Sequence, residues 1–135
     1  MNLRCAPFLK KGTETRRMVF SPRMSHSGYG VDDFPEPYLA KMAHFGLDSI
    51  LVFVKDVHLT SRAGKQYQDL NALIRRAKKY GLDTYLYSYV VAWVHPDDPN
   101  AKEVFDSTYG RIAAAFPEAK GIVFVGESCK FPSKD

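Results

Sequence analysis

The chain has 135 residues, of which 45% are hydrophobic and 13% aromatic, so it is long enough and apolar enough to bury the core of one domain. Lys and Arg outnumber Asp and Glu by 19 to 15, and no motif of basic and aromatic residues accompanies this mild excess, which argues against a nucleic-acid-binding protein. No apolar stretch approaches the roughly 18 residues of a membrane span, and the amino terminus lacks the apolar segment of a signal peptide. We therefore expect no membrane segment and a cytoplasmic location, unless the chain is part of a longer protein.

The amino-terminal part of the chain predicts an extension followed by one strand and one helix. Residues 1–16 are charged and show no periodic pattern, so we assign them to an extension and residues 17–135 to a single domain. The segment Arg17–Ser21 has the apolar content of a first strand, which Pro22 would end. A first helix is expected over Pro35–His44, with its apolar side chains on one side.

The middle of the chain contains an internal repeat. The segments "FGLDSILVFV", from Phe45, and "YGLDTYLYSYV", from Tyr80, lie 35 residues apart and share an aromatic residue, Gly, Leu, Asp and a hydroxyl residue before an apolar run. A helical pattern precedes each copy, and Gly46 and Gly81 fall where a helix ends in a residue of positive φ. The repeat therefore predicts helix, glycine cap and strand in succession.

The carboxyl-terminal part continues this order with a third helix and a fourth strand. Asp98 followed by Pro99 is typical of a helix N-cap and first helical residue, and Pro117 would end the helix. A short apolar run, "GIVFV", follows as the fourth strand. Strands that alternate with helices in this way predict an α/β fold with four consecutive βα-type units and a parallel sheet.

Two architectures fit such units: an open doubly wound sheet, or half of a (β/α)₈ (TIM) barrel, whose full length is typically about 250 residues. No glycine-rich phosphate loop follows the first strand, which argues against a dinucleotide or P-loop protein, so we expect no cofactor. Cys5 and Cys129 lie far apart in the sequence and have no metal-type spacing, so no metal site is expected.

Charged, hydroxyl and aromatic residues gather where the predicted strands end, which is where (β/α)₈ barrels carry their active sites. Glu127 is the strongest candidate, because packing alone does not explain a buried strand that leads into Gly-Glu. The aromatic candidates could stack on sugar rings. The residues that we expect to bind substrate are Arg23, Lys55, Asp56, Tyr89 and Trp93.

Several stretches resemble the first half of glycosidase-type (β/α)₈ barrels: "PEPYLAKMAHFGLDSILVFV", "NALIRRAKKYGLDTYLYSYV" and "FPEAKGIVFVGESCKFPSKD". The resemblance is greatest to catalytic domains related to the family-20 glycoside hydrolases, the β-N-acetylhexosaminidase superfamily. It implies that Glu127 is the general acid at the end of strand four and that Arg23 grips the substrate. Gly126 stands where family-20 enzymes carry the Asp of an Asp-Glu pair.

The resemblance implies a half-barrel of a carbohydrate-active enzyme that is inactive alone and has a carbohydrate ligand. Its partner would be a second copy of the chain or a missing carboxyl-terminal half-barrel. Two alternatives remain: a small noncatalytic α/β ligand-binding module, and a structural remnant without activity.

Overall fold

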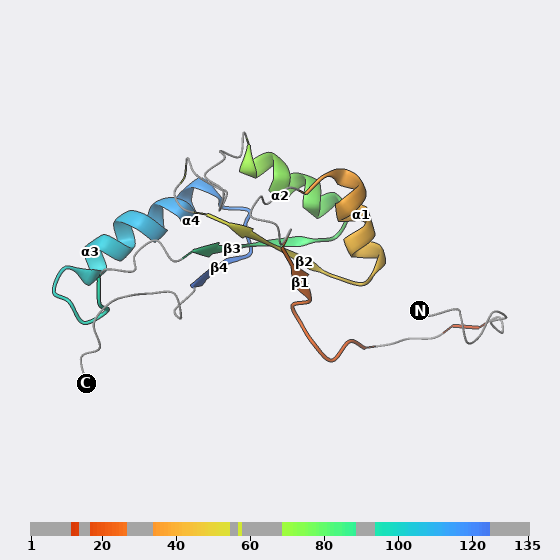
Figure 1. Cartoon of the computed structure of the whole chain (residues 1–135), viewed down its shortest axis with the longest axis horizontal. Coiled ribbons are helices and arrows are strands. Elements are labelled where there is room, and N and C mark those ends of the chain that lie inside the picture. The colour runs from red at the N-terminus through yellow and green to blue at the C-terminus, as the bar shows by residue number, and fades with distance from the viewer. Residues whose placement is uncertain are drawn as a thin grey trace.

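The computed structural model describes residues 12–13, 17–26, 34–54, 57, 69–88 and 94–124. Strands and helices alternate along these residues, as Figure 1 shows. The last helix runs without interruption through three segments, the middle one a π-helical turn. The elements are β1 (Met24–Ser25), α1 (Glu36–His44), β2 (Ser49–Phe53), α2 (Leu70–Lys79), β3 (Asp83–Ser88), α3 (Ala101–Phe105), η1 (Asp106–Gly110), α4 (Arg111–Ala115) and β4 (Gly121–Phe124).

The four strands form one parallel sheet in the order β1-β2-β3-β4, so the protein has an α/β fold. Each crossover moves the chain one strand further in the same direction. Because βα crossovers are right-handed, this order places every helix on the same face of the sheet. Figure 1 shows α1, α2 and the α3–α4 helix together on that face. The described sheet therefore lacks the reversal of strand order that defines a doubly wound sheet.

The hydrophobic core lies between this helical layer and the sheet. The central strands contribute Ile50, Val52 and Leu86 and the residue after β2 is Val54, each with 0% exposure, and α2 contributes Ile74, with 2%. Side chains alternate between the two faces of a strand, so the residues that alternate with these core residues along β2 and β3 belong to the opposite face of the sheet. The register of the strands places Leu51 and Tyr85, and then Phe53 and Tyr87, side by side on that opposite face.

The repeated glycines end the first two helices as the sequence predicts. Gly46 has φ +83° and Gly81 has φ +72°, a conformation that L side chains adopt only with strain. The residue after each glycine closes the helix end, since Leu47 N–H donates to Met42 O (3.1 Å) and Leu82 N–H donates to Ala77 O (3.1 Å). Both helices thus end in a Schellman motif that turns the chain into a strand.

The first strand does not lie where the sequence predicts it. The segment 17–22 is not a strand, and its apolar residues Met18, Val19 and Phe20 are 61%, 89% and 77% exposed. The strand that joins the sheet is β1, which begins after Arg23. The apolar run predicted a strand before Pro22. The strand forms after Pro22 instead, where the backbone pairs with β2 and Arg23 forms an ion pair with Asp48.

The start of the third helix is also corrected. Asn100, not Asp98, is the N-cap of α3, and Asp98 and Pro99 belong to a turn before it. The carboxylate of Asp98 accepts a hydrogen bond from the backbone N–H of His95 (2.9 Å), so it caps this turn and not the helix. Within the described residues, no helix is long and apolar enough to cross a membrane.

Candidate functional site

Arg23 lies at the amino end of the sheet, immediately before β1. Its side chain forms an ion pair with Asp48 (Nη2 to Oδ2, 3.0 Å) and donates hydrogen bonds to the carbonyls of Gly46 (Nε, 2.6 Å) and Phe20 (Nη1, 2.9 Å). The backbone N–H of Arg23 donates to Asp48 Oδ1 (2.8 Å), which also accepts from the hydroxyl of Ser49 (2.9 Å). The guanidinium therefore joins the starts of β1 and β2, at the edge opposite to the carboxyl ends of the strands.

This arrangement lowers the pKa of Asp48 below its ordinary value. Partial burial raises the pKa, but the hydrogen bond from the backbone of Arg23, the hydroxyl of Ser49 and the charge of the guanidinium outweigh it. Asp48 is therefore ionised at neutral pH, and its carboxylate forms an ion pair with the guanidinium of Arg23. The prediction that Arg23 follows the first strand is wrong, because β1 begins after it.

The carboxyl edge of the sheet carries a cluster of rings, which we call the ring cluster: His26, Phe53 and Tyr87. His26 follows β1, Phe53 ends β2 and Tyr87 lies next to the last residue of β3. The Phe53 and Tyr87 ring centroids are 5.1 Å apart with the planes at 57°, and those of His26 and Tyr87 are 6.4 Å apart at 49°. Three neighbouring strands thus bring one ring each to the face of the sheet that the helices leave free.

The three side chains of the ring cluster differ in how much of their surface is exposed to solvent. Phe53 is 3% exposed, Tyr87 is half-buried and His26 is exposed. The phenyl ring is the buried base of the cluster, and the phenol and imidazole offer faces and polar atoms nearer to solvent. Rings that combine an apolar face with a polar edge can stack on the C–H face of a sugar ring and accept or donate hydrogen bonds at its hydroxyls.

The structure leaves most of the predicted site outside the described residues. Lys55, Asp56, Tyr89, Trp93 and Glu127 all fall there, so the structure brings none of them together and separates none of them. None of the three ring-cluster residues is among the site residues predicted from the sequence, and Phe53 is the most buried of them. The alternation of side chains along "SILVFV" and "YLYSYV" would have placed it beside Tyr87 once the register of the two strands was known.

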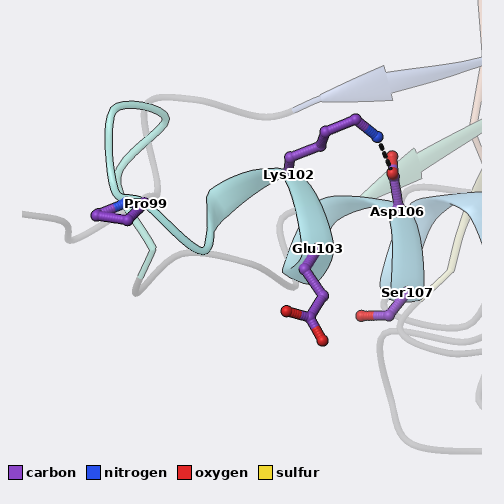
Figure 2. Close-up of a pocket in the computed structure, with 5 residues that line it drawn as sticks. All are labelled: Pro99, Lys102, Glu103, Asp106 and Ser107. Carbon is purple, nitrogen blue, oxygen red and sulfur yellow. Dashed lines mark hydrogen bonds and ion pairs between the residues drawn. The ribbon is translucent and has the colours of Figure 1, made fainter.

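An open pocket lies along the exposed side of the α3–η1 helix, and Figure 2 shows the residues that line it. Lys102 and Asp106 form an ion pair on one side of the helix, and Glu103 and Ser107 point to the other side. The charges on the first side neutralise each other and every lining residue is exposed, so nothing there favours a ligand. Among the residues that the structure describes, no group of three or more His, Cys, Asp or Glu side chains could hold a metal ion.

The fold and the ring cluster define the class: an α/β protein with a parallel sheet wound in one direction and rings gathered at its carboxyl edge. Comparison with protein-family models, with curated proteins and with solved structures finds no match to this chain.

Proposed function

We propose that the chain is a half-barrel of a glycosidase-type enzyme and binds carbohydrate at the carboxyl edge of its sheet. The observation that carries the proposal is the ring cluster of His26, Phe53 and Tyr87, because three successive strands present it on one face and at one edge. The strand order supports the barrel part of the proposal. A sheet whose strands follow one another in sequence, with all helices on one face, has the arrangement of consecutive barrel units.

Glu127 is the proposed general acid. It lies three residues after the end of β4 in the sequence, and the resemblance to glycosidase-type barrels implies this role for it. A carboxyl group in apolar surroundings keeps its proton to higher pH and can deliver it to the oxygen of the leaving group. Glycoside hydrolysis generally needs a second carboxylate, so we expect weak activity or none from the chain alone. Arg23 has no place in this proposal, since its guanidinium lies at the opposite edge of the sheet.

Binding is tested by titrating the chain with methyl glycosides and recording the amide and aromatic signals by NMR. Tyr87→Ala should weaken binding by about fivefold or more, since stacking on one aromatic ring contributes roughly 1 kcal/mol or more. Tyr85→Ala is the matched control, because Tyr85 lies on the same strand and face, two residues nearer to the amino end. Equal loss in both variants, or no binding by the parent chain, would contradict the proposal.

Catalysis is tested separately with a panel of nitrophenyl glycosides. Hydrolysis that Glu127→Gln abolishes would identify the general acid. Binding without hydrolysis would instead identify the chain as a noncatalytic ligand-binding module, and neither binding nor hydrolysis would leave a structural remnant.

A further inference from the structure

The two outer strands of the sheet each have one edge that pairs with nothing in the described part of the chain. β1 pairs with β2 alone and β4 with β3 alone. Tyr87 O accepts from Val54 N–H at the end of β2 (3.0 Å), and peptide groups point alternately to the two sides of a strand, so the peptide groups of Leu86 and Ser88 face β4. Val123 stands in register with Tyr87, so the N–H and C=O groups of Gly121 and Val123 point toward β3, and those of Ile122 and Phe124 point away from it. By the same alternation, the peptide groups of Met24 point away from β2, since Arg23 O accepts from Ser49 N–H (3.2 Å).

The face of the sheet opposite to the helices is apolar up to its β4 edge. Leu51, Tyr85 and Tyr87 are half-buried there, and none of them belongs to the core beneath the helices. Val123 stands in register with Tyr87 on this face and is 38% exposed, whereas Phe124 lies on the helix face, with its ring 4.7 Å from that of Tyr109. An apolar edge strand with free peptide groups is a template for pairing with another strand.

We propose that a second copy of the chain covers this face and pairs with both free edges, closing an eight-stranded barrel. In this dimer β4 of each copy lies parallel to β1 of the other, so one two-fold axis along the barrel generates both junctions. The strand count favours this occupant: a barrel of about eight strands has an interior that side chains alone can fill, and each copy supplies four strands. The proposal rests on the half-barrel architecture of the proposed function, and it names the partner that completes it.

The arrangement also unites the two ring clusters. Each would lie at the carboxyl mouth of the same barrel, facing the axis from opposite sides.

The sharpest test compares two neighbouring amides of β4 in the unaltered chain. Val123 N–H points toward β3 in monomer and dimer alike, whereas Ile122 N–H is protected only when another strand pairs with it. Hydrogen exchange followed by NMR should show protection of Val123 at every protein concentration. Protection of Ile122 should rise with concentration, in parallel with a mass that light scattering places near twice 15.3 kDa.

Variants of Ile122 and Val123 provide the second test. Ile122→Pro removes the outward N–H and Val123→Lys places a charge on the open face, so both should yield monomers, whereas Val123→Ala keeps the outward N–H of Ile122 and should stay dimeric. A monomeric parent chain, an assembly larger than a dimer, or a dimer in which Ile122 N–H exchanges freely would overturn the proposal. A monomer that still binds methyl glycosides would overturn the dimer but support the proposed function. A dimer that binds no methyl glycoside would support the dimer but contradict the proposed function.

Discussion

The carboxylate of Asp48 holds Arg23 twice, through its guanidinium at 3.0 Å and through its backbone N–H at 2.8 Å. The first contact joins two side chains and the second fixes the backbone where β1 begins. Asp48 belongs to the repeated Gly-Leu-Asp segment, which follows the end of α1. The same residue therefore fixes the start of β1, the strand that neighbours β2. The equivalent Asp83 ion-pairs with Lys120 (3.5 Å), the residue before β4.

Asp48→Asn should lower the free energy of unfolding at about pH 7 by about 1 kcal/mol, since the side chain is 31% exposed and solvent screens part of the interaction. The pKa of Asp48 is lower in the folded than in the unfolded chain, so the carboxylate stabilises the fold above about pH 4 and loses this effect as the pH falls through the folded-state pKa. Urea unfolding at about pH 7 and about pH 3 should therefore show a smaller difference between parent and variant in acid. Glu118→Gln, at an exposed pair 3.9 Å from Arg75, serves as the control. A difference of equal size at both pH values would refute this role.

Gly81→Ala should destabilise the fold by about 1–2 kcal/mol, because Gly81 has φ +72°. The cost would be conformational alone, since no atom lies within 4 Å of the position of an added Cβ. Gly110→Ala is the opposite case, since Gly110 has helical φ −62° and equal space, and we expect a gain of about 0.5–1 kcal/mol. Thermal unfolding followed by circular dichroism measures both, and changes of the same sign would contradict the expectation.

Leu86→Ala should cost about 2–5 kcal/mol, because Leu86 is fully buried at the centre of the core between β3 and the helices. Leu51→Ala removes the same atoms from the half-buried opposite face, where we expect a smaller loss. Chemical denaturation of both variants compares the two faces of the sheet directly. Equal losses would show that the opposite face is packed as tightly as the helix-covered core.

Asp69→Ala should destabilise α2 by about 1 kcal/mol, because the Asp69 carboxylate accepts the N–H of Ala72 (2.8 Å) as the N-cap. Asp69→Asn keeps an acceptor and loses only the charge, which lies 3.9 Å from an exposed Arg75. The Asn variant should therefore stay close to the parent chain in urea unfolding. A loss as large as that of the Ala variant would assign the effect to the ion pair.

The helices, their glycine caps and the parallel sheet could be predicted from the sequence, because each depends on residues close together in the chain. Gly46 and Gly81 are examples, since the positive φ that they adopt follows from their place after an amphipathic pattern. The position of β1 could not be predicted in this way. It depends on Asp48, which lies 25 residues from Arg23 and whose role appears only when the strands pair.

The site residues predicted at the carboxyl edge of the sheet lie outside the described residues, so their prediction stays a prediction. The ring cluster lies at the same edge, but none of its residues is among those candidates. The contact between Phe53 and Tyr87 depends on strand register, which no single segment encodes. The start of α3 shows a further limit, since Asp98 satisfies the N–H of His95 in a turn that has the same residue types as a helix cap.

The sequential order of the strands has a consequence for the synthesis of the chain. Every pairing in the described sheet joins a strand to the one translated just before it, so no strand waits for a distant segment to leave the ribosome. The strand translated last is therefore always the edge strand to which the next strand is added. The sheet can therefore be assembled in the order of translation, one unit of about the repeat length at a time.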